Sequence, residues 1–168
     1  MKIRFFLLSL GLTAAAAFAQ NNNVVRWLQI NGVTTAPGAD NPVGGVIHGG
    51  AGPWTTKEGN ARIDLSTGDG FFEVEGLVLN GGNASGTPGP INSVVGTLVC
   101  NAGTQNQTVL DTPATDLSSR GDAELTFRLN VPSACDNPLF LIRIPQVGLR
   151  WIATGAIRVN GHGNGSGN

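Results

Sequence analysis

Apolar and polar residues alternate along several short stretches of the chain, with the period of two that places successive side chains on opposite faces of a β-strand. The clearest stretch is residues 123–131, where five apolar side chains alternate with polar or charged ones. Residues 61–65 and 72–78 alternate in the same way, and the sequence between them, at 66–70, is the glycine-rich run Ser-Thr-Gly-Asp-Gly. A run of this kind and length joins hairpin strands, so the pattern predicts a β-hairpin here.

Further strands are expected where the pattern is less regular. Candidate segments are residues 24–33, 93–101, 108–111 and 139–144. The segments 93–101 and 139–144 are apolar on both faces, as expected for strands in the middle of a packed sheet. A further strand is expected near the C-terminus. Its apolar face consists of Leu149, Trp151, Ala153, Ile157 and Val159, and its polar face contains Arg150, Thr154 and Arg158.

The whole pattern predicts an all-β fold. The chain has 25 glycines and 9 prolines, and no segment keeps a helical period over ten residues or more. We therefore expect an antiparallel two-sheet sandwich, immunoglobulin-like or jelly-roll-like, with seven or eight short strands; a small closed barrel is the alternative. Residues 34–56 and 80–90 are rich in glycine and proline and are expected to form surface loops.

The N-terminus has the three zones of a secretory signal peptide. Lys2 and Arg4 precede an apolar run over residues 5–12, which is followed by an alanine-rich end. Ala17 and Ala19 are the small residues that signal peptidase requires, so we expect cleavage after Ala19 and export to a periplasm or the extracellular medium. The apolar run is too short to span a membrane, so no membrane insertion is expected after cleavage.

Cleavage would leave a chain of single-domain length. We expect one sandwich domain over residues 20–159 and a disordered Gly/Asn-rich tail over residues 160–168, which has no apolar residue after Asn160. Without Lys2 and Arg4 the chain has 8 Lys plus Arg against 11 Asp plus Glu, a net charge of −3. With one lysine remaining and no basic cluster, nucleic acid is not expected as a partner.

Cys100 and Cys135 are the only cysteines. In an oxidising compartment an even pair indicates a disulfide. A metal pair or a catalytic thiol would need a Cys-x-x-Cys motif or additional histidines, which the sequence does not offer. We therefore predict one disulfide between Cys100 and Cys135.

The sequence over residues 60–77, Asn-Ala-Arg-Ile-Asp-Leu-Ser-Thr-Gly-Asp-Gly-Phe-Phe-Glu-Val-Glu-Gly-Leu, resembles the opening hairpin of the chordin-type (CHRD) domains of bacterial secreted proteins. Residues 87–98 are similar to the second conserved stretch of that family. The chain departs from the family pattern because it lacks the His-x-His pair that usually follows the hairpin, and His48 lies before it. The resemblance implies a β-sandwich and implies no activity.

Catalytic and ligand-binding residues are few. His48 could serve as a general base only with a nucleophile and an orienting carboxylate, and the sequence has no Gly-x-Ser-x-Gly turn to supply the nucleophile. His162 lies in the tail. Trp54 follows Pro53 within the long loop, and an exposed ring there could stack on a sugar, whereas Trp27 and Trp151 are expected to pack in the core. The other interpretation of Trp54 is a buried anchor for the loop.

Asp64 and Asp69 flank the hairpin turn and are weak candidates for a calcium site, because calcium is bound by several converging oxygens. Their spacing does not match an EF-hand loop, and no cofactor is otherwise expected. The leading hypothesis is an exported, non-catalytic β-sandwich that acts by surface binding or structural association, with a protein or glycan as the partner. The alternatives are a carbohydrate-binding module using Trp54 and, third, a hydrolase.

Overall fold

The computed structural model describes residues 23–160. The predicted signal peptide, its cleavage site and residues 161–168 of the predicted tail lie outside the described residues. Asn160, which was assigned to the tail, is the last residue of a strand.

The described chain is all-β, and every strand pairing in it is antiparallel. The strands of four residues or more are β1 (Val24–Gly32), β3 (Glu58–Asp64), β4 (Asp69–Glu75), β6 (Ser93–Cys100), β7 (Thr108–Asp111), β9 (Ala123–Arg128), β10 (Leu139–Ile144) and β11 (Arg150–Asn160). Three strands have two residues each, namely β2 (Trp54–Thr55), β5 (Val78–Leu79) and β8 (Thr115–Asp116). One 3-10 turn, η1, covers Pro145–Val147.

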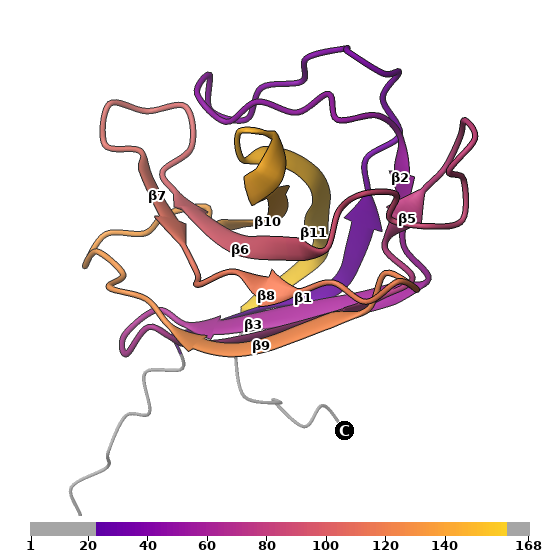
Figure 1. Cartoon of the computed structure of the whole chain (residues 1–168). Coiled ribbons are helices and arrows are strands. Elements are labelled where there is room, and N and C mark those ends of the chain that lie inside the picture. Colours follow the sequence, from indigo (N-terminus) through magenta and orange to yellow (C-terminus); the bar gives the residue numbers. More distant parts are fainter. Residues whose placement is uncertain (1–22, 161–168) are drawn as a thin grey trace, which may run out of the picture.

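Eight strands form one continuous path in the order β7-β6-β10-β11-β1-β3-β4-β9. The sheet curls so that β6 and β10 lie over β3 and β9, which gives the molecule two layers (Figure 1). At the margin, β8 pairs with β6, and the Thr115 hydroxyl donates to the Glu124 carbonyl of β9 at 3.1 Å. The expected antiparallel sandwich is thus confirmed, with its layers formed largely by two halves of one sheet. The separate second sheet contains only β2 and β5.

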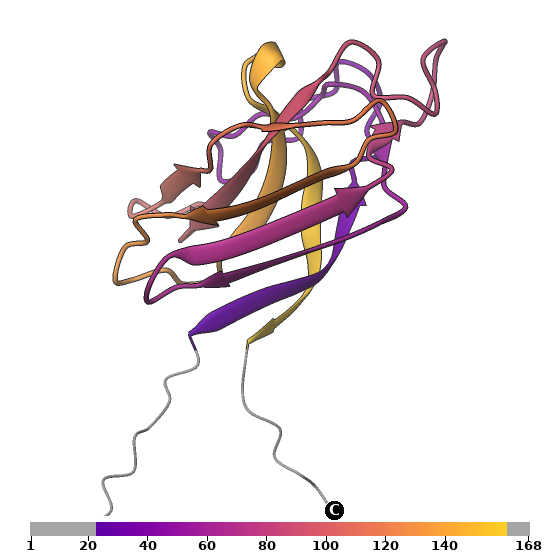
Figure 2. The same cartoon turned by 60° about the horizontal axis from the view of Figure 1, so that its bottom comes forward.

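The core between the layers is built around three aromatic rings. Phe140 lies with its ring centroid 5.6 Å from those of both Trp27 and Phe72, and all three side chains are buried. Glycines make room for these rings, since a Cβ at Gly155 would lie 2.6 Å from the Trp27 indole. β1 and β11 are paired side by side, and the first residues of β1 lie next to the last residues of β11 (Figure 2).

The loop before β2 packs against the start of β11 rather than extending into solvent. Ile47 in this loop is 2% exposed, the Trp151 indole donates to the Asn41 carbonyl at 2.9 Å, and the Arg150 guanidinium donates to the Gly49 carbonyl. The expected long irregular segment is therefore present, but it packs against the start of β11 and ends in β2.

This covering loop explains an error in the predicted face of the C-terminal strand. Trp151, Ile152 and Ala153 are all buried, because β11 is covered on both sides, whereas Ile157 and Val159 are 56% and 39% exposed. Ile157 also has a positive φ of 51°, which interrupts the regular alternation of the strand. Residues 123–131 likewise form a shorter strand than expected, since β9 ends at Arg128.

The predicted disulfide is confirmed. Cys100, at the end of β6, is bonded to Cys135 in the loop before β10, with a Cα–Cα distance of 4.7 Å. A second cross-connection is polar: Arg143 of β10 donates to Asp111 of β7 at 2.9 Å, and the Thr97 hydroxyl of β6 donates to the same carboxylate at 2.6 Å. Within residues 23–160 no helix is long and apolar enough to cross a membrane.

Candidate functional site

His48 lies in the loop before β2 and is paired with a carboxylate that sequence reasoning missed. Its Nδ1 lies 2.7 Å from Asp40 Oδ2, and the Gly49 amide donates to Asp40 Oδ1 at 3.3 Å. The hydrogen bond from His48 lowers the pKa of the Asp40 carboxyl below its usual value. The pair could orient a general base, but none of the side-chain hydrogen bonds of the described residues joins a hydroxyl to His48.

Trp54 does not offer its ring to a ligand. The residue is 1% exposed, its amide donates to the Val33 carbonyl at 2.6 Å, and β2 pairs with β5 through Trp54 and Leu79. A sugar-stacking aromatic must present a ring face to solvent, so the buried ring of Trp54 does not support the sugar-stacking interpretation. The burial of Trp54 agrees with the other interpretation, in which this side chain anchors the long loop. Trp27 and Trp151 are also buried, as expected.

Asp64 and Asp69 line one shallow pocket, together with Arg26 and Arg62. Asp64 accepts hydrogen bonds from the Ser66 hydroxyl and amide, which lower the pKa of its carboxyl, and Asp69 lies 3.7 Å from Arg128 Nε. Among the described residues, no group of three or more His, Cys, Asp and Glu side chains could hold a metal ion. The calcium site stays a prediction that these contacts do not support.

An exposed arrangement of charged side chains lies on the solvent side of β1, β3, β4 and β9. We call this surface the outer face and define it by the exposed or half-buried side chains Arg26, Leu28, Glu58, Asn60, Arg62, Phe71, Glu73, Glu75, Glu124, Thr126 and Arg128. These residues alternate with the buried core residues of the same strands. In Figure 2 these strands form the layer that comes forward.

Strand register places like charges opposite each other on the outer face. Arg26 of β1 is directly opposite Arg62 of β3. Two residues further along the strands, Glu73 of β4 is opposite Glu124 of β9, and two residues beyond that pair, Glu58 of β3 is opposite Glu75 of β4. The outer face therefore has a basic pair, Arg26 and Arg62, and beside it an acidic end that contains Glu58, Glu73, Glu75 and Glu124.

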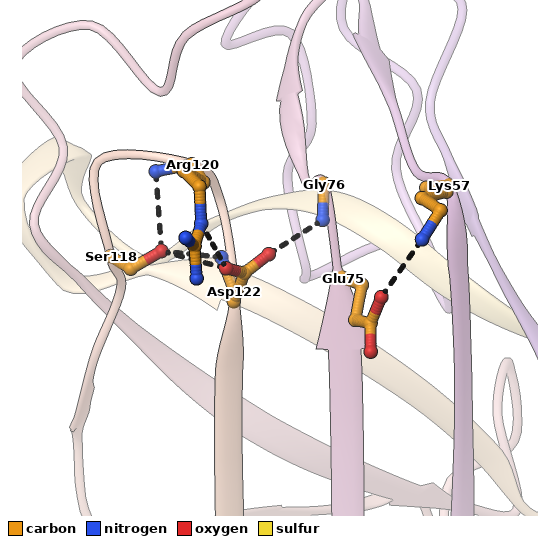
Figure 3. A network of polar contacts seen from close by, with 6 residues as sticks. All are labelled: Lys57, Glu75, Gly76, Ser118, Arg120 and Asp122. Atoms are coloured by element: carbon orange, nitrogen blue, oxygen red, sulfur yellow. Dashed lines mark hydrogen bonds and ion pairs between the residues drawn. The ribbon is translucent and has the colours of Figure 1, made fainter.

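The acidic end carries its own polar contacts (Figure 3). Lys57 lies 3.2 Å from both Glu58 and Glu75, which partly compensates that pair. Asp122, just before β9, accepts from the Gly76 amide at 3.1 Å and from Arg120 Nε at 3.1 Å. These two hydrogen bonds, with one from Ser118, lower the pKa of the Asp122 carboxyl. Among the described residues, no side chain hydrogen-bonds to the Glu124 carboxylate; the Thr115 hydroxyl donates to the backbone carbonyl of this residue.

Apolar side chains lie between and beside these charges. Leu28 is 52% exposed and lines a groove of about 380 Å³ with Glu58, Glu73 and Glu75. Phe71 is half-buried beneath Arg62, whose Cζ lies 6.0 Å from the ring centroid. Ile157 of β11 extends the exposed apolar surface beyond β1. An exposed apolar patch rimmed by charges is typical of an interaction surface.

Comparisons with protein-family models, with curated proteins and with solved structures find no match for this chain. The resemblance to chordin-type domains therefore stays a prediction.

Proposed function

We propose that this chain is an exported, non-catalytic protein that acts by association, and that the outer face is its contact surface. The observation that carries the proposal is the set of three like-charged cross-strand pairs around exposed Leu28. Like charges in directly opposite positions destabilise a sheet. A partner that places acidic groups against the arginine pair and basic groups against the glutamate pairs would relieve that repulsion. Burial of Leu28 and Ile157 would add to the affinity.

The disulfide supports the proposed compartment. Disulfides form and persist in oxidising surroundings such as a periplasm or the extracellular medium. The bond between Cys100 and Cys135, together with the three-zone N-terminal sequence, is the basis for proposing export.

The other candidate functions have less support. A glycan-binding module would need an exposed aromatic platform, and Trp54 is buried. A hydrolase would need a nucleophile beside His48, and within residues 23–160 the His48 side chain hydrogen-bonds to Asp40 alone. Association through the outer face needs no catalytic group.

Site-specific photo-crosslinking in the producing cell tests the proposal. A photoreactive amino acid replaces Leu28 on the outer face or, as the matched control, Val147 in η1, which is 42% exposed against 52% for Leu28. We expect discrete protein adducts from position 28 and none from position 147. Equal adducts from both positions, or none from position 28, would overturn the proposal.

A thermal-unfolding screen against calcium and a panel of soluble glycans tests the alternatives. A ligand present at one hundred times its dissociation constant stabilises the folded state by about 2.7 kcal/mol, which gives a readable shift in melting temperature. We expect no shift. A shift that Trp54→Phe leaves intact and that Asp64→Asn with Asp69→Asn removes would assign the binding to calcium and contradict the proposal.

A further inference from the structure

We infer that the fold selects Asn80 as a site of spontaneous covalent modification, namely deamidation through a cyclic imide, with water as the co-reactant. Asn80 directly precedes Gly81 in the loop after β5. It lies outside the outer face, so this modification is independent of the proposed association. The grounds are the glycine that follows Asn80, the exposure of its loop and the contrast with a second Asn-Gly pair in β1.

The reaction takes place within the chain. The backbone nitrogen of Gly81 attacks the Cγ of the Asn80 side chain and forms a C–N bond. The side-chain nitrogen leaves as ammonia and takes the proton of the Gly81 amide with it. Water then opens the five-membered imide at either carbonyl, which gives isoaspartate or aspartate, and no atom is oxidised or reduced. Glycine favours the attack because it has no Cβ to crowd the nitrogen.

The loop after β5 leaves both reacting groups free to approach each other. It projects from the body of the molecule (Figure 1, Figure 2), and Asn80, Gly81 and Gly82 are all exposed. The Asn80 amide donates to the Pro53 carbonyl at 2.9 Å. Within residues 23–160, no hydrogen bond involves the Gly81 amide or the Asn80 side chain. The rotation that brings the Asn80 Cγ to the Gly81 nitrogen therefore breaks no hydrogen bond of the fold.

The base of the same loop is fixed, so the fold should tolerate the product. The Leu79 amide donates to the Thr87 carbonyl at 2.9 Å, and the Gly86 amide donates to the Leu79 carbonyl at 2.9 Å. Isoaspartate adds a methylene to the backbone, and this lengthening falls within residues 80–85, between the two ends of the closed base. The modified chain should therefore stay folded and carry an additional negative charge.

The same dipeptide occurs in a protected place. Asn31 and Gly32 lie in β1, where Asn31 is paired with Thr154 and Gly32 with Ala153 of β11. A Cβ at Gly32 would clash with the Trp54 carbonyl, so this segment is also packed against β2. Turning the peptide group between Asn31 and Gly32 toward the Asn31 side chain requires this part of the ladder to open. Asn31 should therefore react slowly, although its side chain is exposed.

A time course of the purified, oxidised protein at mildly alkaline pH, followed by tryptic peptide mapping, tests the inference. The basic residues are placed so that residues 27–57 form the peptide with Asn31 and residues 63–120 form the peptide with Asn80. Two further Asn-Gly pairs, at 160–161 and 164–165, fall in a third peptide and are measured separately. Tandem mass spectrometry locates each amide-to-acid conversion and distinguishes isoaspartate from aspartate.

In the folded protein we expect Asn80 to convert at least about tenfold faster than Asn31, because ladder hydrogen bonds must first break at Asn31. Isoaspartate should exceed aspartate at position 80, which is the signature of the imide. In denaturant, with the disulfide reduced, the two asparagines should convert at similar rates. Asn80→Gln is the matched variant: glutamine would have to close a six-membered ring, so position 80 should stay unmodified while Asn31 converts as before.

Circular dichroism and thermal unfolding establish that Asn80→Gln is folded. Equal rates at Asn80 and Asn31 in the folded protein, or conversion of Asn80 in denaturant alone, would overturn the inference. Aspartate without isoaspartate at position 80 would exclude the imide. A difference between the two sites that persists unchanged in denaturant would show that the flanking residues, and not the fold, select the site.

Discussion

Glu73 of β4 lies directly opposite Glu124 of β9, and both side chains are exposed on the outer face. Because directly opposite like charges repel, we expect Glu124→Lys to raise the free energy of unfolding by about 0.5 kcal/mol. Urea unfolding at sub-micromolar protein measures the change, and Glu124→Gln should give a smaller gain. The gain should shrink at high salt, and a loss of stability at low salt would contradict the prediction.

The disulfide is expected to be the largest single contribution to stability from any one bond. The cross-link closes a loop with a sequence separation of 35 residues. In the chain-entropy model its removal costs about 3.5–4 kcal/mol, so Cys100→Ala with Cys135→Ala should lower the urea midpoint strongly. Reduction of the unaltered protein is the matched control, and an unchanged midpoint in either sample would refute this expectation.

Arg143 and Asp111 form a largely buried ion pair, with side chains 10% and 35% exposed. Asp111→Ala leaves the guanidinium without its carboxylate and the Thr97 hydroxyl without its acceptor. Allowing for the partial exposure of Asp111, we expect a cost of about 2–3 kcal/mol.

A double-mutant cycle with Arg143→Met isolates the interaction between these two side chains. The double variant should be less destabilised than the sum of the two single variants, because neither charge is then left buried and unpaired. Strict additivity would show that the pair contributes no coupling.

Gly155 is required by its contact with Trp27. A Cβ at position 155 would lie 2.6 Å from indole ring atoms, and Trp27 itself is fixed against Phe140. Overpacking of this kind costs about 1–3 kcal/mol, so Gly155→Ala should lower the melting temperature. Trp27→Leu leaves space there, so adding Gly155→Ala to it should cost less than Gly155→Ala does alone. If Gly155→Ala destabilises the unaltered protein and the Trp27→Leu variant equally, the contact with Trp27 is not the reason that position 155 requires glycine.

The strands could be predicted wherever the pattern of apolar and polar residues reflects which faces of the strand are buried. The bounds of β7 and β10 agree with the predicted segments. For β10 the reason is that a run buried on both faces is apolar throughout and differs from its polar flanks. Ile157 was predicted to lie on the apolar face of its strand, but it is exposed. Its positive φ interrupts the alternation of faces, and the loop before β2 packs against the start of the same strand; the residue pattern indicates neither feature.

The candidate site could not be predicted, because it depends on which strands are neighbours. Glu73 and Glu124 are far apart along the chain, and either glutamate alone is an ordinary residue on the wet face of a strand. Only the register of β4 against β9 places the two carboxylates opposite each other. Asp40 was missed beside His48 for a similar reason, since no periodic pattern relates two residues of an irregular loop.

Acid should destabilise the corner at Asp122, where the Gly76 amide, Arg120 and Ser118 all donate to one carboxylate (Figure 3). These bonds lower the pKa of the folded-state carboxyl below the ordinary value of 3.8. Because the unfolded state then binds the proton more readily, the stabilisation is fully present well above pH 3.8 and is lost as the pH falls through the folded-state pKa.

Carboxyl NMR titration should therefore give Asp122 a pKa below 3.8, and the free energy of unfolding should fall as the pH drops past that value. Asp122→Asn removes the titrating group, so its unfolding free energy should decline less steeply with acid than that of the unaltered protein. Asp136→Asn is the matched control, because none of the side-chain hydrogen bonds or ion pairs of residues 23–160 involves the Asp136 carboxylate. Parallel declines for Asp122→Asn and the unaltered protein would show that protonation of this corner does not set the acid limit of stability.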